Sequence, residues 1–213
     1  MKAITILITT LAVHSGTEKI NFDASGHFYV NGLKGLVRFN LGEPDSGILF
    51  HSSTNGTYDA KCLLNGNILI ADYNSLREYT GTGVYVRNIN PAPAYAMNYL
   101  KGIEYDSESN SIFVAHSGTS ADPRNFVKLD YTTGQFVSAT EFRHGNDLVL
   151  ATDGRIVAGS WSLRPGIFTQ DPTQIGSFTG GNTNPMFVTQ LVPEPASALF
   201  LGLAALAFRR RRR

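Results

Sequence analysis

Hydrophobic and polar positions repeat one short pattern four times along the chain. In each repeat a tight-turn signal lies between two short apolar runs, as expected for two strands joined by a hairpin. The turn signals are Ala24-Ser25-Gly26, Asn65-Gly66, Ser107–Asn110 and Asp153-Gly154. With Gly26, Gly66, Asn110 and Gly154 as markers, the repeats are 40, 44 and 44 residues apart. The pattern therefore predicts four hairpins at a nearly constant interval.

Two further strand-like runs follow each predicted hairpin. The third runs cover Leu36–Phe39, Leu76–Tyr79, Phe126–Leu129 and Gly166–Phe168, and the fourth runs cover Gly47–Phe50, Val84–Ile89, Gln135–Ala139 and Ile175–Phe178. The body has no convincing helical period. Units of four antiparallel strands at this interval indicate an all-β fold, a β-propeller of about four four-stranded blades. A two-sheet sandwich and a β-solenoid are the alternatives, but sandwich strands show no such fixed period.

The blades resemble those of the NHL, YVTN and gluconolactonase-like propellers. Two segments carry the resemblance, Asn146–Ile156 and Ile20–Phe39. How the ring closes stays open, because an unclosed fan would expose sheet faces and long edges. A small four-bladed ring, pairing with a second copy and a chain that has lost blades are the three possibilities. The strand-like run Met186–Val192 could also return to the first blade as a closing strand.

Residues 192–213 consist of three consecutive parts. Val192, Pro193, Glu194 and Pro195 form an extended segment, because the prolines can neither continue a helix nor donate to a sheet. The stretch Ala196–Phe208 is uncharged and rich in alanine and leucine. The chain then runs through Arg209, Arg210, Arg211, Arg212 and Arg213, which stay with water and anionic lipid headgroups. This order resembles the PEP-CTERM sorting signal of Gram-negative bacteria.

The resemblance implies an export route. Ala196–Phe208 would form a short transmembrane helix that holds the chain briefly in the inner membrane. An exosortase-type membrane peptidase would then process it near the motif, and the product would reach the cell surface or extracellular matrix. Thirteen residues rise only about 20 Å as a helix, against a hydrocarbon core of about 30 Å, which suits a transient anchor. A permanent anchor and a basic tail for nucleic acid or lipid are the alternatives.

The amino terminus is interpreted as a signal peptide covering residues 1–15. Met1-Lys2 is a minimal basic start, Ala3–Val13 is mostly apolar, and Val13-His14-Ser15 precedes a cleavage site ahead of Gly16. This leaves residues 16–191 as the repeat domain. The alternative is that Ile4–Val13 is a β-strand, since isoleucine, threonine and valine favour strands.

Charge and cysteine content restrict the function classes. The chain has 18 basic and 17 acidic residues, and without the five terminal arginines its body is net acidic. An acidic body gives no electrostatic reason to bind nucleic acid. Cys62 is the one cysteine, so no internal disulfide can form. Its apolar neighbours predict a buried thiol rather than a nucleophile.

Polar residues at the strand ends supply a possible ligand face, because one set of propeller loops meets around the central channel. We assign to this face Asp72, His116, Asn146, Asp147 and Trp161, accompanied by Asn31, Tyr58, Asp59, Asn98, Lys101 and His144. Trp161 could stack on a sugar ring. No catalytic set is evident, since the chain lacks a Gly-x-Ser-x-Gly elbow and its histidines lack ligand spacing. These features favour a non-enzymatic protein without a cofactor that binds extracellular polysaccharide or another envelope protein.

The alternative function is a secreted metal-dependent hydrolase of the gluconolactonase type. In that family, asparagine, aspartate and glutamate oxygens hold a divalent metal such as calcium on this face. Asn146 and Asp147 match the start of the corresponding blade strand. Asp59 and Gly102 stand at the equivalent places without a clear asparagine, so the metal set is incomplete.

Overall fold

The computed structural model describes residues 19–32, 34–40, 43–89, 96–117, 123–142, 145–160 and 164–177. The predicted signal peptide, closing strand Met186–Val192 and sorting signal with its helix lie outside these residues, as do Trp161 and His144. All the elements described are strands, and this part of the chain has no helix that is long and apolar enough to cross a membrane.

The described strands form four antiparallel sheets of four, each ordered as in the sequence. Blade 1 contains β1 (Ile20–Phe22), β2 (His27–Gly32), β3 (Gly35–Asn40) and β4 (Glu43–Ser52), and blade 2 contains β5 (Thr57–Cys62), β6 (Ile68–Asp72), β7 (Leu76–Tyr79) and β8 (Tyr85–Ile89). Blade 3 contains β9 (Leu100–Asp106), β10 (Ser111–His116), β11 (Phe126–Asp130) and β12 (Phe136–Thr140), and blade 4 contains β13 (Gly145–Leu150), β14 (Ile156–Ser160), β15 (Gly166–Phe168) and β16 (Gln174–Ser177). The predicted all-β architecture of four four-stranded units is confirmed.

A residue with positive φ closes the first hairpin of every blade. The φ angle is 84° at Gly26, 81° at Gly66, 51° at Asn110 and 78° at Gly154. Glycine adopts this region without a Cβ penalty, and asparagine tolerates it better than most residues. A Cβ at Gly26 or Gly66 would meet nothing within 4 Å, so backbone conformation rather than space favours glycine there. The four sequence markers are therefore hairpin tips, as predicted.

Neighbouring blades pack face to face through apolar clusters. Between blades 1 and 2, Tyr29 and Leu36 pack with Ala60, Ile68 and Ile70. Blades 2 and 3 share a cluster that includes Leu69, Leu76, Ile89, Ile103, Ile112 and Val114, and blades 3 and 4 share Phe113, Phe126, Leu148, Ile156 and Phe168. Burying one such side chain contributes about 1.5–3 kcal/mol. Because each blade covers a face of the next, the repeat stabilises itself as a stack.

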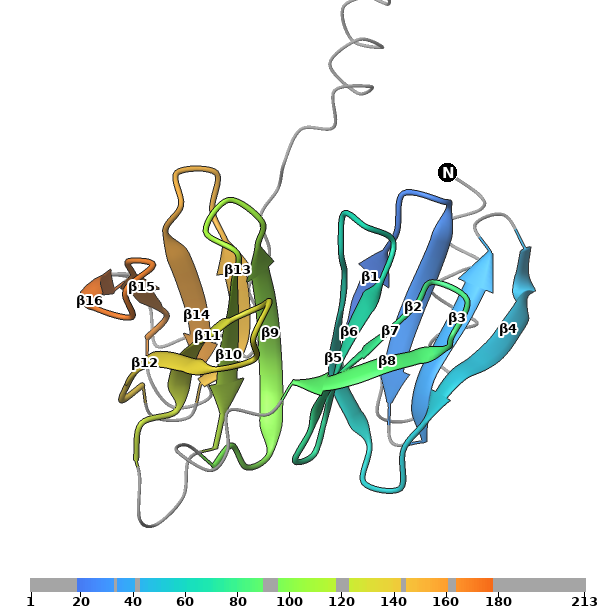
Figure 1. Cartoon of the computed structure of the whole chain (residues 1–213), viewed down its shortest axis with the longest axis horizontal. Helices are drawn as coiled ribbons and strands as arrows, with labels where there is room; N and C mark the ends of the chain where they lie inside the picture. The colour runs from blue at the N-terminus through green and yellow to red at the C-terminus, as the bar shows by residue number, and fades with distance from the viewer. Residues whose placement is uncertain are drawn as a thin grey trace, which may run out of the picture.

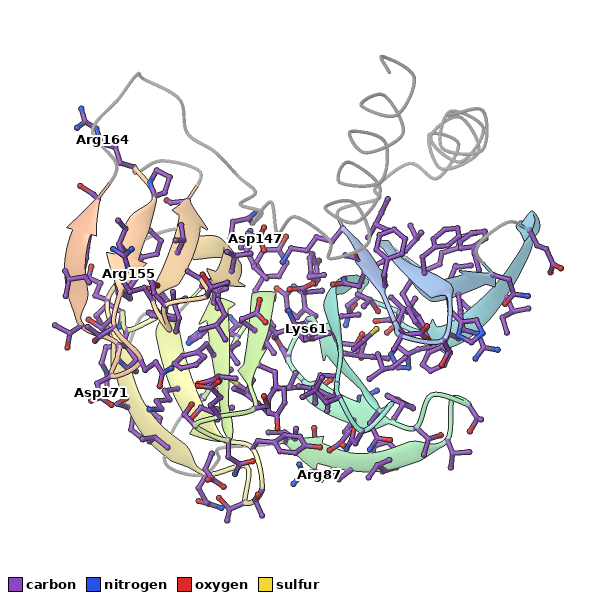
Figure 2. The ribbon with its side chains drawn as sticks, turned by 90° about the horizontal axis from the view of Figure 1, so that it is seen from above. Lys61, Arg87, Asp147, Arg155, Arg164 and Asp171 are labelled. Atoms are coloured by element: carbon purple, nitrogen blue, oxygen red, sulfur yellow. The ribbon has the colours of Figure 1, made fainter. Side chains whose placement is uncertain are left out.

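The four blades follow one another around an arc. Seen from above, the sheets run from blue through green to orange around a common centre (Figure 2). The first strands lie nearest that centre, with β1 beside β5, β5 beside β9, and β9 beside β13. Figure 1 shows blades 1 and 2 on the right and blades 3 and 4 on the left. Among the described residues, no strand of blade 1 packs extensively on a strand of blade 4.

A β-bulge recurs at the start of the first strand in blades 2, 3 and 4. The register shift inserts one extra residue, which is Tyr58 in blade 2, Lys101 in blade 3 and Asn146 in blade 4. A bulge bends its strand and re-aims the adjacent side chains, and bulges are frequent beside functional sites. The same end of three blades therefore carries the same local distortion of the first strand.

Candidate functional site

Three charged side chains converge where the first strands begin. The Nζ atom of Lys19, just before β1, lies 2.6 Å from Oδ2 of Asp59 in β5 and also contacts Oδ1 of Asp147 in β13. Asp59 and Asp147 occupy equivalent positions in their blades. Each pairs with the residue of the second strand that lies five positions after the hairpin marker. Figure 2 places Asp147 near the centre of the arc. One lysine thereby joins the first, second and fourth blades.

Gly102 holds the equivalent position in blade 3, where space requires glycine. A Cβ there would lie 3.0 Å from the Cα of Asp147 and 3.1 Å from the carbonyl oxygen of Asn146. Both atoms belong to the backbone, which cannot move aside as a side chain can. The missing side chain therefore allows β9 to approach β13 closely beside the charged cluster.

Backbone amides hold both carboxylates in place. The amide of Ile103 donates to Oδ2 of Asp59 over 2.8 Å, and the amide of Ala60 donates to Oδ1 over 2.8 Å. The amide of Leu148 donates to Oδ1 of Asp147, again over 2.8 Å. Such charge-assisted bonds are stronger than neutral ones and compensate for burial of the charge. The orientation of both aspartates is thus fixed by the backbone.

Burial and mutual attraction set the protonation of this cluster. Burial lowers the pKa of the Lys19 ammonium, but Asp59 and Asp147 outweigh it, and the pKa lies above its ordinary value. Burial is also the main reason that the pKa of Asp59 is raised; Asp147 raises it further, and Lys19 opposes the shift. Lys19 therefore stays protonated near neutral pH, while Asp59 takes up a proton more readily than an exposed aspartate.

The cluster does not fit a divalent metal ion. An ammonium group already contacts both carboxylates, and a metal ion beside it would be repelled. Within the described ranges, no three histidine, cysteine, aspartate or glutamate side chains are grouped so that they could hold a metal. The residues at Asn146 and Asp147 therefore give no support to the metal-dependent hydrolase.

Asp72 forms a buried link between blades 1 and 2. Its Oδ2 atom lies 2.9 Å from Nε2 of His51 in β4, and its Oδ1 atom accepts a hydrogen bond of 2.9 Å from the hydroxyl of Thr57 in β5. His51 is itself buried. Paired buried polar groups of this kind orient their elements. Asp72 lies at the predicted end of its blade, but it contacts protein neighbours there.

The structure brings four of the five predicted face residues to the end where the first strands begin. His116 pairs across a bulge with Leu100, the equivalent of the pairing between Asp72 and Thr57. His116 is fully buried, and Asn146 and Asp147 are nearly so. The repeat predicted that the four residues lie at the same end of their blades. It did not predict their burial, because burial depends on how closely the first strands approach one another.

A cluster of three tyrosines lies at this same end, between blades 2 and 3. The ring centres of Tyr58 and Tyr99 are 4.8 Å apart, those of Tyr73 and Tyr99 are 4.9 Å apart, and those of Tyr58 and Tyr73 are 6.5 Å apart. The ammonium of Lys101 lies 4.4 Å from the centre of the Tyr99 ring, within cation–π range. Tyr73 is 36% exposed, so the cluster reaches the surface.

The backbone beneath the tyrosine cluster is unusual. Tyr99 has a φ of 56°, a left-handed conformation that costs a side-chain-bearing residue free energy. Its amide donates to Oδ1 of Asn74 over 3.3 Å, and the amide of Leu100 donates to the carbonyl of Tyr73 over 3.0 Å. These bonds join the turn after β6 to the residue before β9, and so hold the three rings together.

Sequence reasoning assigned Tyr58 and Lys101 to this face but missed Lys19, Tyr73 and Tyr99. Lys19 could have been found by aligning the repeats, because it stands seven residues before its hairpin marker, as Asp59 and Asp147 do before theirs. Tyr73 and Tyr99 are 26 residues apart and give no local signal. Only the packing of blade 2 on blade 3 brings them together.

Two cavities lie toward the hairpin tips, away from the tyrosines. The cavity between blades 1 and 2 measures about 680 Å³, and its lining includes Phe22, Arg38 and Cys62. The second measures about 420 Å³, and its lining includes the ion pair of Lys61 and Glu104. Cys62 is half-buried rather than fully buried, and burial raises the pKa of its thiol to about 12, so it is a poor nucleophile.

The fold has relatives among solved structures, although no family model and no curated protein matches the chain. The WD40 domain of Neurospora crassa Pan2 superposes with a TM-score of 0.60 and 16% identity, covering 79% of this chain and 51% of that one. The WD40 β-propeller domain of Doa1 gives 0.61 and 13%, covering 80% and 55%. The extracellular domain of BT4673 from B. thetaiotaomicron gives 0.56 and 14%, covering 79% and 26%. The chain thus has a propeller fold and spans about half the length of the WD40 domains it matches.

Proposed function

We propose that this chain is an exported, non-enzymatic propeller protein that binds saccharide at the cell surface or in the extracellular matrix. The tyrosine cluster of Tyr58, Tyr73 and Tyr99 is the observation that carries this proposal. Trp161, the aromatic residue expected from the sequence to stack on a sugar, lies outside the described residues. A propeller fold suits binding and structural roles alike, so the function is argued from this site.

Sugar recognition needs an aromatic surface beside polar groups, and the cluster has both. Aromatic faces contact the C–H surface of a sugar ring, while neighbouring donors and acceptors bind its hydroxyls. Lys101 lies over the Tyr99 ring, and the side chain of Asn74 accepts a hydrogen bond from the Tyr99 amide. The strained φ of Tyr99 holds its ring against the other two at a cost in stability, as is frequent at binding sites.

The binding test uses the full chain and a panel of soluble bacterial and plant polysaccharides in affinity gel electrophoresis. Replacing Tyr73→Ala removes the most exposed ring and should weaken retardation by at least about tenfold, equivalent to about 1.4 kcal/mol. Tyr85→Ala is the matched control, because Tyr85 is 54% exposed on β8, far along blade 2 from the cluster. Equal retardation of all three proteins, or retardation of none by any polysaccharide, contradicts the saccharide proposal.

Export and sorting rest on the resemblance of residues 192–213 to the PEP-CTERM signal. The extracellular domain of BT4673, which has a similar fold, is compatible with this location. We infer an exosortase-type peptidase as processing partner and a transient stay in the inner membrane. Mass spectrometry of the protein recovered from its native cell tests the route. A mature form that ends near Pro195 is expected, whereas a cytosolic protein that keeps Arg209–Arg213 contradicts it.

A further inference from the structure

Blade 1 presents one apolar sheet face that no other described blade covers. Cross-strand pairing places Ile20 beside Val30, and Phe22 beside Phe28, on a single face. Phe28 is buried between Phe22 and Phe39, with ring centres 6.1 and 4.8 Å away. On the same face, Ile20 is 41% and Phe22 59% exposed, whereas Val30 is only 3% exposed. We call this surface of β1, β2 and β3 the leading face of blade 1.

The same face of every later blade packs on the blade before it. Phe22 corresponds to Cys62 in blade 2 and to Leu150 in blade 4. Each of the three pairs with the residue that lies two positions after the hairpin marker of its own blade. Cys62 packs at the seam between blades 1 and 2, and Leu150 at the seam between blades 3 and 4. The leading face is therefore built like three surfaces that serve as blade-to-blade interfaces.

Blade 4 presents the complementary face. Its residues Val149, Val157 and Ile167 are paired across β13, β14 and β15 and are half-buried. The equivalent face of blade 3, which contains Phe113, packs on Leu148 and Ile156 of blade 4. We call the surface of Val149, Val157 and Ile167 the trailing face of blade 4. Among the described residues, one chain thus carries a leading face and a trailing face that no other blade packs against, and these are the two kinds of face that meet at its internal seams.

The four blades superpose on propeller domains that are about twice as long. Four blades superpose on the WD40 domains over 79% and 80% of this chain but only 51% and 55% of those chains. A tightly curved four-bladed ring would not follow the larger propellers over that length. A ring of that length therefore needs about as many blades again as this chain supplies.

We propose that two copies of this chain close one ring, with the leading face of blade 1 in each copy packing on the trailing face of blade 4 in the other. A two-fold axis makes both seams at once, so no leading or trailing face stays open and no filament grows. Each new seam repeats the sheet-on-sheet packing already present between blades 3 and 4. The proposal goes beyond saccharide binding and does not depend on it.

Sedimentation of the full chain in a mild detergent tests the stoichiometry. A dimer is expected, and Phe22→Glu should shift it to monomer by placing a charge in the seam. Val84→Glu is the matched control, because Val84 is 62% exposed but lies at the turn before β8. Val157→Glu, on the trailing face, gives an independent second variant. A wild-type monomer, or a dimer that neither Phe22→Glu nor Val157→Glu weakens, overturns the proposal.

A cysteine pair then checks the register of the seam. Glu104 in blade 3 accepts a hydrogen bond of 3.4 Å from the amide of Leu150 in blade 4. Val149 and Phe22 are the corresponding residues at the proposed seam. In a Cys62→Ser background, Phe22→Cys with Val149→Cys should give a covalent dimer with a short bis-maleimide, and Val84→Cys with Val149→Cys should not. Crosslinking within single chains would show instead that one copy closes on itself, and it would overturn the proposal.

Discussion

The carboxylate of Glu78 in blade 2 accepts a hydrogen bond of 2.6 Å from the hydroxyl of Tyr131 in blade 3. Arg87 donates to the other oxygen of Glu78 over 2.8 Å, and to the carbonyls of Tyr131 and Thr132 over 2.6 Å each. The Glu78 side chain is only 3% exposed. Arg87 lies on the outer side of the arc, away from Asp147 (Figure 2). The outer strands of two blades are therefore joined by a buried polar network.

Removing the charge of Glu78 should destabilise the protein. Glu78→Gln keeps the size of the side chain but weakens its bonds to Tyr131 and Arg87. Hydrogen bonds to a charged group contribute about 1.5–3 kcal/mol, so the free energy of unfolding should fall by about that amount in urea denaturation. Glu108→Gln is the control, because Glu108 is exposed at a hairpin tip. Equal unfolding curves for the wild type and Glu78→Gln would contradict this role.

Stability should also fall in acid because of this carboxylate. Burial alone would raise the pKa of Glu78, but the hydrogen bonds from Tyr131, Asn67 and Arg87 outweigh it and hold the pKa below its ordinary value of 4.5. A lowered folded-state pKa gives stability that is fully present above pH 4.5 and is lost as pH falls through the folded-state pKa. Unfolding measured from pH 7 to pH 3 should show this loss, with a smaller slope in Glu78→Gln.

Loss of Lys19 should destabilise the protein by leaving the carboxylates of Asp59 and Asp147 without their cation. Lys19→Met leaves Asp59 and Asp147 buried and facing each other, and breaking a buried pair in this way costs about 3–5 kcal/mol. Adding Asp59→Asn to Lys19→Met removes one of the two negative charges and should recover part of the loss. Thermal unfolding of both variants measures it. A double variant less stable than Lys19→Met would contradict the electrostatic account.

Gly102 should not accept even a methyl group. Gly102→Ala places a Cβ 3.0 Å from the Cα of Asp147, and overpacking of this kind costs about 1–3 kcal/mol. Gly176→Ala is the matched strand control, because its nearest neighbour would be Cδ1 of Ile167 at 3.9 Å. Urea denaturation should show a loss for Gly102→Ala and little change for Gly176→Ala. Equal stability of the two variants would contradict the close approach of β9 and β13.

The thiol of Cys62 should react slowly in the native protein. With its pKa raised to about 12 by burial, the thiolate fraction at pH 8 is far below that of an ordinary thiol, and the thiolate is the reactive form. Alkylation by iodoacetamide, followed by mass spectrometry, should be at least about a hundredfold slower in the folded chain than in urea. Similar rates in both states would mean that the thiol is accessible and ordinary.

Much of the fold could be predicted from the repeat, because each hairpin tip has a turn signal in its own local sequence. Gly66 and Gly154 stand where a positive φ is needed, and the apolar runs on either side are short enough to be strands. The candidate site was predicted only in outline. The end of the blade that carries Asp72 and Asn146 follows from topology, whereas His51, one of the partners of Asp72, comes from another blade.

By itself, the sequence determined the number of blades, the strands in each and the face on which Asp147 lies, since these depend on turn chemistry and on side chains that alternate along a strand. Only the tertiary structure decided that Lys19 meets Asp59 and Asp147 at the axis, and that Tyr58, Tyr73 and Tyr99 share one surface. Such contacts depend on the angle and distance between separate sheets. Those quantities are set by how whole faces pack, and no local pattern in the chain encodes them.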